Sequence, residues 1–167
     1  SNVATITIEV IAANADTPSI TNTNTLENQQ TTDGLVISRN IADGNEVTHF
    51  KITNIQNGEL FQNNGTIPIN DGDFITFAQG NAGLKFTPAL NSNTAGAFTI
   101  QASMTSNDGG LGGNSVTATI TIGAVANIPS VTEASTLEDT MTNDGLVISR
   151  HPDDGTEVNY FKITNII

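Results

Sequence analysis

Along most of the chain, apolar residues alternate with polar ones in short runs, and Gly, Asn and Asp separate the runs. A period of two is typical of β-strands with one buried face, because successive side chains point to opposite sides of a strand. Seven or eight such strands joined by tight turns fit an immunoglobulin-like, Greek-key β-sandwich. We therefore expect an all-β fold, with strands at residues 19–22, 34–39, 47–55, 59–62, 74–78, 83–87, 97–105 and 115–122.

The same alternation predicts which side chains form the core. The residues expected to point inward are Phe50, Ile52, Ile100 and Ala102, with Phe61, Phe74 and Phe86 as further core candidates. The residues expected to point outward are His49, Lys51 and Thr53.

Two segments of the chain recur at one common offset. The heptapeptide DGLVISR occupies 33–39 and again 144–150, and FKITNI occupies 50–55 and again 161–166. A third match, ATITI, precedes the first copy at residue 4 and recurs at residue 118, with a slightly larger offset. A unit of about 110 residues has the size of one immunoglobulin-like sandwich.

The phase of this repeat predicts three parts. Residues 1–16 are expected to be the last strand of one unit and a linker, with the strand at 4–8. Residues 17–126 are expected to be a complete unit whose sandwich ends near Gly123, and residues 127–167 the first strands of a following unit, including 145–150. Neither outer part is expected to fold alone, because each exposes unpaired strand edges and half of a core.

The charge of the chain narrows the choice of partners. There are 17 Asp and Glu against 5 Lys and Arg, which gives a net charge of −12 and a surface that repels nucleic acid. No Cys is present, so disulfides and thiolate metal sites are excluded. No apolar run approaches the roughly 20 residues of a membrane-spanning helix, so we expect no membrane insertion in this segment.

The predicted topology gathers acidic and amide side chains at the two ends of the complete unit. The N-terminal end is expected to collect Asn14, Asp16, Asp43, Glu46 and Asp108. The C-terminal end, with the start of the next unit, is expected to collect Glu27, Asn127, Asp153, Asp154 and Glu157, and Glu138 repeats the position of Glu27. Asp-Gly and Asn-Gly pairs are also ordinary turn residues, so a single pair means little by itself.

Calcium fits such loops, because Ca²⁺ takes roughly six to eight oxygen ligands at about 2.3–2.6 Å from carboxylates, amides, backbone carbonyls and water. Glu27 and Glu46 have no role in turns, and both recur, at Glu138 and Glu157. The joint placement of these residues predicts calcium at both junctions between units.

These residues resemble the cadherin-like repeats of large bacterial surface and secreted adhesins of the RTX type. The resemblance implies calcium ligands at the early Glu (Glu27 and Glu138), the acidic loop (Asp43, and Asp153 with Asp154), the late loop (Asp108) and the linker (Asn14 and Asp16). Three features depart from the family: the linker 126–129 has no acid, the first acidic loop has one Asp, and the Asp-Arg-Glu motif of animal cadherins is absent. The resemblance therefore implies one or two ions per junction.

The leading interpretation is a structural and adhesive unit of an extracellular, cell-surface or secreted protein. Calcium at the junctions would stiffen the array, and the partners would be neighbouring units, a second copy, or a cell-surface or glycan target. The alternative is a calcium-dependent carbohydrate-binding module, because such sites on sandwiches also use Asp and Asn loops.

Other functions have less support in the sequence. We expect no enzyme, because the two His residues, His49 and His151, align with Tyr160 and Asn40 of the other copy, so no His chemistry repeats. An isopeptide bond through Lys51 or Lys162 is disfavoured because both are expected to point outward. Asn64 begins the one Asn-x-Thr acceptor pattern, which is equally typical of a hairpin turn.

Overall fold

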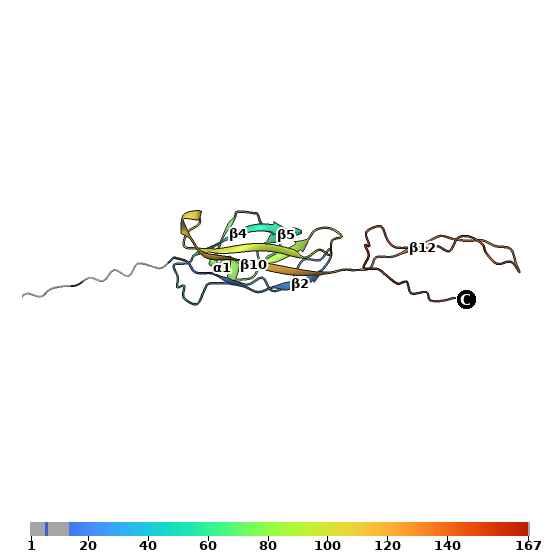
Figure 1. Cartoon of the computed structure of the whole chain (residues 1–167), viewed down its shortest axis with the longest axis horizontal. Helices are drawn as coiled ribbons and strands as arrows, with labels where there is room; N and C mark the ends of the chain where they lie inside the picture. Colours follow the sequence, from blue (N-terminus) through green and yellow to red (C-terminus); the bar gives the residue numbers. More distant parts are fainter. Residues whose placement is uncertain (1–5, 7–13, 167) are drawn as a thin grey trace, which may run out of the picture.

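A computed structural model of the protein describes residue 6 and residues 14–166. The molecule is elongated, with a strand-rich body followed along the long axis by a more open second part that begins after β10 (Figure 1). The body contains all but two of the strands; those two, β11 (Ser130–Val131) and β12 (Ile148–Ser149), pair with each other in the second part.

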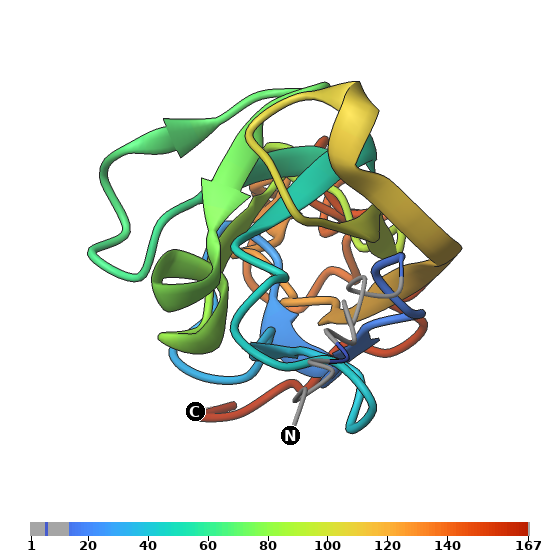
Figure 2. The same cartoon turned by 90° about the vertical axis from the view of Figure 1, so that its left-hand side faces the viewer.

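The main sheet of the body is mixed and has five strands. Its order is β2 (Thr23–Leu26), β10 (Leu111–Gly123), β9 (Gly96–Ser103), β4 (His49–Gln56) and β7 (Phe74–Thr76). The pair β2 and β10 is parallel and the other pairs are antiparallel. Viewed along the long axis, the strands curl around a common interior (Figure 2).

Two smaller sheets complete the body. The three-stranded sheet has the order β6 (Pro68–Ile69), β5 (Gly58–Phe61) and β8 (Lys85–Pro88). The two-stranded sheet joins β1 (Ser19–Ile20) to β3 (Ile37–Ser38). The prediction of a mostly β protein is confirmed, whereas the finer expectation of a Greek-key sandwich stays a prediction.

The core lies between the curled sheet and these smaller elements. The predicted inward residues Phe50, Ile52, Ile100 and Ala102 are all fully buried, which confirms the alternation in β4 and β9. They belong to one cluster with further buried side chains of the body, among them Leu35, Ile37, Leu60, Leu84, Phe86, Phe98 and Ile120. Of the three further core candidates only Phe86 is fully buried; Phe61 and Phe74 are half-buried.

The strand predicted at 74–78 is wrong in its second half, because the chain turns into the short helix α1 (Phe77–Asn81). Thr76 and Gln79 form a capping box: the Thr76 hydroxyl accepts from the Gln79 amide, and the Gln79 side chain accepts from the Thr76 amide. Such a box satisfies amide groups that a first helical turn leaves without partners. Gly80 then lets the helix lie directly on the Phe50 ring.

Two strands were not anticipated. Thr23–Leu26 forms β2 because it pairs with the end of β10, a partner far along the chain, at the register Ile120↔Thr23. Pro68–Ile69 forms β6 beside β5. The predicted strand at 19–22 ends at Ile20, and that at 34–39 is reduced to Ile37–Ser38.

The second part repeats local contacts of the body at the offset of the sequence repeat. Ser19 and Ile20 pair with Ser38 and Ile37, and Ser130 and Val131 pair with Ser149 and Ile148 in the same way. The strand expected at 145–150 is thus reduced to Ile148–Ser149. The strand expected at 4–8 lies outside the described residues.

Within residues 14–166, no helix has the length and apolar character that crossing a membrane requires.

Candidate functional site

The linker before the body is held by the loop between β3 and β4. The backbone N–H of Asp16 donates to Asp43 Oδ1 at 3.0 Å, and the Asn40 side-chain amide donates to the Thr17 carbonyl at 2.9 Å. The loop is closed on itself, because the Asp43 N–H donates to the Asn40 carbonyl at 3.0 Å. The acidic loop therefore binds the backbone of the linker, and Asp16 contributes to this contact through its N–H.

The other side of this linker rests on two glycines at the start of β10. A Cβ on Gly112 would lie 2.3 Å from the Ala15 carbonyl oxygen, and one on Gly113 would lie 2.3 Å from the Thr17 nitrogen. The Asn114 N–H donates to the Thr17 hydroxyl at 2.9 Å. Glycines are needed here because only a bare backbone can approach the linker so closely.

The linker after the body is held in the same manner as the first. The backbone N–H and the side-chain amide of Asn127 both donate to Asp154 Oδ1, at 3.0 Å and 2.9 Å. The Asp154 N–H donates to the His151 carbonyl at 3.0 Å, which matches the contact of Asp43 with Asn40. Asp43 and Asp154 thus perform one task at two equivalent positions of the repeat.

A glutamate fixes each acidic loop from within. Glu46 Oε1 accepts from the Gly44 N–H at 2.7 Å, and Glu157 Oε1 accepts from the Gly155 N–H at 2.6 Å. The hydrogen bond from Gly44 is the main cause that lowers the pKa of Glu46, with Arg39 adding a smaller effect in the same direction. Both glutamates keep the loop shape that aims the aspartate at the linker.

Each of the two aspartates has one carboxylate oxygen without a partner. Oδ2 of Asp43 and Oδ2 of Asp154 are buried and accept no hydrogen bond from the described residues. The Asn127 N–H nevertheless lowers the pKa of Asp154, so this carboxylate is charged near neutral pH. A buried anionic oxygen without a donor is costly, and a bound cation is one way to satisfy it.

Glu27 lies at the C-terminal end of the body. Its side chain is 5 % exposed and accepts a short hydrogen bond from the Val125 N–H, and its own N–H donates to the Gly123 carbonyl at 2.9 Å. It therefore holds the exit of β10, just before Asn127. The expectation that Glu27 is a ligand at the second junction stays a prediction, and no hydrogen bond joins it to Asp154 among the described residues.

The remaining predicted ligands are not drawn into either site. Asp108 is exposed and forms a 2.6 Å ion pair with Lys51, which confirms that this Lys points outward. The others are also exposed on the surface: Asn14, Glu138 and Asp153. Within the part of the chain that the structure describes, no three Asp, Glu or His side chains are close enough to bind one metal ion together.

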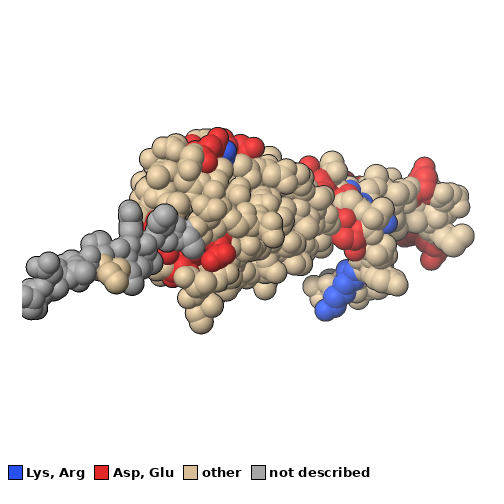
Figure 3. All heavy atoms as spheres, turned by 60° about the vertical axis from the view of Figure 1, so that its left-hand side comes forward, with Lys and Arg blue, Asp and Glu red and all other residues tan. Residues whose placement is uncertain are grey.

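Acidic side chains nevertheless gather by region. They appear at the N-terminal end of the body and again over the second part, with a largely uncharged surface between them (Figure 3).

Sequence reasoning identified the acids but missed the roles of Asn40, Gly112 and Gly113. The signal for the glycines was their density in the run NDGGLGG.

The described residues define a mostly β protein whose acidic loops hold the backbone of its linkers. Comparisons of the chain with protein-family models, with curated proteins and with solved structures find no match.

Proposed function

We propose that this protein is a structural and adhesive part of an extracellular, repetitive surface protein, built from immunoglobulin- or cadherin-like β-sandwich units, in which calcium bound at the junctions stiffens the array. The proposal is carried by one observation. Asp43 and Asp154 each hold a linker N–H with Oδ1 and keep Oδ2 buried and unpartnered, at equivalent positions of the repeat.

The chemistry of these groups suits a hard cation. Oδ2 of the aspartate is a carboxylate oxygen already desolvated and fixed in direction by the hydrogen bond on Oδ1. Glu46 in the first junction and Glu157 in the second each place a second carboxylate in the same loop, with Oε1 engaged and Oε2 available. Backbone carbonyls of the linker and water supply the further oxygens that Ca²⁺ takes.

Calcium would act on the linkers more than on the body. The linker contacts are few hydrogen bonds, whereas the body has a continuous core. At free calcium ten times the dissociation constant, one site contributes about 1.4 kcal/mol, which is small beside the stability of a domain but large beside a linker contact. Extracellular calcium modules bind Ca²⁺ with dissociation constants of about 10⁻⁴–10⁻³ M. The sites would therefore be occupied outside cells and empty in the cytosol.

The test is calcium titration of the whole chain by calorimetry, with small-angle scattering in calcium and in chelator. We expect saturable binding in the range of about 10⁻⁴–10⁻³ M and a narrower, more extended distribution of shapes in calcium. The double variant Asp43→Asn with Asp154→Asn should bind at least tenfold more weakly. Asn keeps an acceptor for the linker N–H but replaces the second carboxylate oxygen by an amide donor.

The matched control is the double variant Asp33→Asn with Asp144→Asn, which makes the same change at another pair of equivalent repeat positions, in exposed turns. It should bind calcium like the parent chain. Absence of saturable binding, together with identical scattering in calcium and chelator, would exclude calcium as the stiffening ion. A glycan screen in calcium separates a carbohydrate-binding module from a stalk, because a stalk should retain no glycan.

A further inference from the structure

The loop between β5 and β6 carries the one Asn-x-Thr pattern of the protein, at Asn64-Gly65-Thr66. The two strands pair antiparallel, so the pattern lies in a hairpin loop. Asn64 and Thr66 are both exposed. A hairpin loop does not compete with the role of an acceptor for an N-linked sugar, because an acceptor must lie in an exposed surface loop.

Contacts with other parts of the body fix the backbone on both sides of Asn64. The side-chain amide of Asn63 donates to the Ala82 carbonyl at the end of α1, at 2.7 Å. The side-chain amide of Gln30 donates to the Gly65 carbonyl at 3.1 Å. Asn64 is therefore carried on a backbone that is anchored immediately before and immediately after it.

The side-chain amide of Asn64 is also held in one orientation. Its Oδ1 accepts from the Thr66 N–H at 3.1 Å and from the Ile67 N–H at 3.2 Å. Only the oxygen of an amide accepts hydrogen bonds, so these two donors leave Nδ2 as the free end of the side chain. Among the described residues, neither Nδ2 nor the Thr66 hydroxyl has a hydrogen-bond partner.

This arrangement suits a reaction at the amide nitrogen. An amide nitrogen is a weak nucleophile because its lone pair is shared with the carbonyl group. It becomes reactive as it loses a proton and negative charge moves to the amide oxygen. The two N–H donors on Oδ1 of Asn64 stabilise this charge, as the donors of an oxyanion hole do.

We propose that Asn64 is a modification site that receives an N-linked saccharide. The donor is a sugar joined through its C1 atom to a phosphate, either of a nucleoside diphosphate or of a lipid pyrophosphate. The bond between Nδ2 and C1 forms, and the bond between C1 and the phosphate oxygen breaks. The electron pair of the broken bond leaves with the phosphate, and the Nδ2 proton passes to a base of the transferring enzyme.

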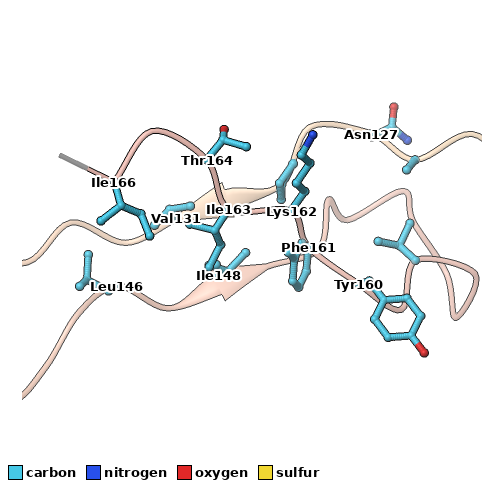
Figure 4. A pocket seen from close by; sticks show the side chains of 13 residues that line it. Asn127, Val131, Leu146, Ile148, Tyr160, Phe161, Lys162, Ile163, Thr164 and Ile166 are labelled. Atoms are coloured by element: carbon cyan, nitrogen blue, oxygen red, sulfur yellow. The ribbon is translucent and has the colours of Figure 1, made fainter.

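An uncharged hollow beside the loop has room for the attached sugar. Its volume of about 380 Å³ is within the roughly 300–1,000 Å³ of small-molecule sites. The hollow is lined by Gln62, Asn63, Asn64, Ala78, Gln79 and Ala82. In contrast, a hollow in the second part is lined mainly by apolar side chains such as Val131, Ile148 and Phe161 (Figure 4). The amide lining beside Asn64 suits the hydroxyl groups of a sugar, because each amide both donates and accepts hydrogen bonds.

The test incubates the folded full chain with two kinds of enzyme in separate arms. One is a soluble N-glycosyltransferase with a nucleotide sugar, and the other is a membrane oligosaccharyltransferase with a lipid-linked saccharide. We expect the sugar on Asn64 in at least one arm, as located by mass spectrometry of peptides, and the arm identifies the donor. Asn64→Gln should abolish the modification. Thr66→Val removes the hydroxyl but keeps the N–H that Oδ1 accepts, and it should lower the initial rate at least tenfold.

The matched control places the same triplet in another turn, between β4 and β5. The double variant Asn64→Gln with Glu59→Thr removes the natural triplet and creates Asn-Gly-Thr at 57–59, where the first and third positions are also exposed. There, however, the Asn57 side-chain nitrogen donates to the Ala95 carbonyl at 2.8 Å. This variant should be modified at least tenfold more slowly than the parent chain, whereas synthetic peptides of the two triplets should be modified at equal rates.

Three results would overturn the proposal. The first is no modification of the folded chain in either arm, while a control acceptor peptide is modified under the same conditions. The second is modification of Thr66→Val at the rate of the parent chain. The third is an equal rate at the two triplets in the folded proteins, which would show that the orientation of the Asn64 amide has no part in the reaction.

Discussion

At the scale of residues, a few short contacts fix the position of each linker. One carboxylate oxygen of Asp43 or Asp154 orients a linker N–H, and a glycine pair at the start of β10 gives the first linker room to lie on the sheet. Adding a side chain at these glycines, or protonating these aspartates, is therefore expected to change the geometry of the linkers before it changes the core.

Gly113→Ala is expected to displace the first linker. Gly113 has φ +62°, so any side chain there costs about 1–2 kcal/mol in left-handed backbone strain. The added methyl group also collides with the Thr17 nitrogen, so 15–17 must move away from β10. We expect lower stability to urea and faster proteolysis within 14–18.

Gly72→Ala is the matched control for this change. Gly72 has φ +90°, but a Cβ there meets nothing within 4 Å. It should show a similar loss of stability from backbone strain and no change in cleavage at the linker. Equal proteolysis in the two variants would mean that the close approach of Gly113 to Thr17 does not hold the linker.

Acidification is expected to release the second linker. The pKa of Asp154 is lowered mainly by the Asn127 N–H, so the folded state binds the proton more weakly than the unfolded chain. The stability that this contact contributes is complete above the ordinary Asp pKa and is lost as the pH falls through the lowered value. The amide shift of Asn127 should titrate with a midpoint below the ordinary Asp pKa.

The variant Asp154→Asn tests the assignment of this titration. Asn keeps an oxygen that accepts from the Asn127 N–H but has no carboxyl proton to bind. The Asn127 amide shift should then be independent of pH between about 2 and 6, a range that brackets the ordinary Asp value. A titration that persists unchanged in this variant would assign it to another group.

At the scale of elements, the transition from β7 to α1 shows how local signals end a strand. Phe74, Thr76 and Ala78 continue a plausible alternation, yet the capping box of Thr76 and Gln79 begins a helix at Phe77. The helix matters to the core because its Gly80 backbone lies against Phe50 and Ile37.

Thr76→Val is expected to lower the free energy of unfolding by about 1 kcal/mol, the usual cost of a lost N-cap. Val keeps the branched shape that suits the end of β7 but lacks the hydroxyl that accepts from the Gln79 N–H. Urea denaturation provides the measurement. Thr121→Val, at an exposed position of β10, is the control and should change stability by less than about 0.5 kcal/mol.

At the scale of the whole molecule, one sequence occupies two environments. FKITNI lies in β4 at 50–55, between β7 and β9, and recurs at 161–166 without a strand partner among the described residues. Identical sequence means nearly identical intrinsic exchange rates for the backbone amides, so any difference in exchange reports tertiary structure alone.

Hydrogen exchange is expected to separate these two copies sharply. Paired amides in 50–55 should be protected by about 10³-fold or more, as expected for the core of a domain with ordinary stability. Amides of 161–166 should exchange at close to the intrinsic rate. Mass spectrometry of peptides from both regions provides the measurement, and equal protection would show that the second part is covered in solution.

The candidate site was predictable in its chemistry and less so in its geometry. The repeat located Asp43 with Asp154 and Glu46 with Glu157, since each pair is separated by the same offset as the DGLVISR and FKITNI segments. The pairing of Asp108 with Lys51 was not foreseen, because it joins a loop to a strand face 57 residues away. The contribution of Asp16 through its N–H also depends on how the linker approaches the loop, which no sequence spacing encodes.

The sequence by itself determined the mostly β class, the faces of β4 and β9 and the spacing of the repeated segments, because these depend on alternation and identity along the chain. Tertiary structure decided the rest. It placed β2 beside the end of β10, turned 77–81 into a helix against Phe50, and left Phe161 and Ile163 exposed where Phe50 and Ile52 are buried. The physical reason is that burial depends on which distant strands reach a side chain, and the same FKITNI segment meets those strands in one place and not in the other.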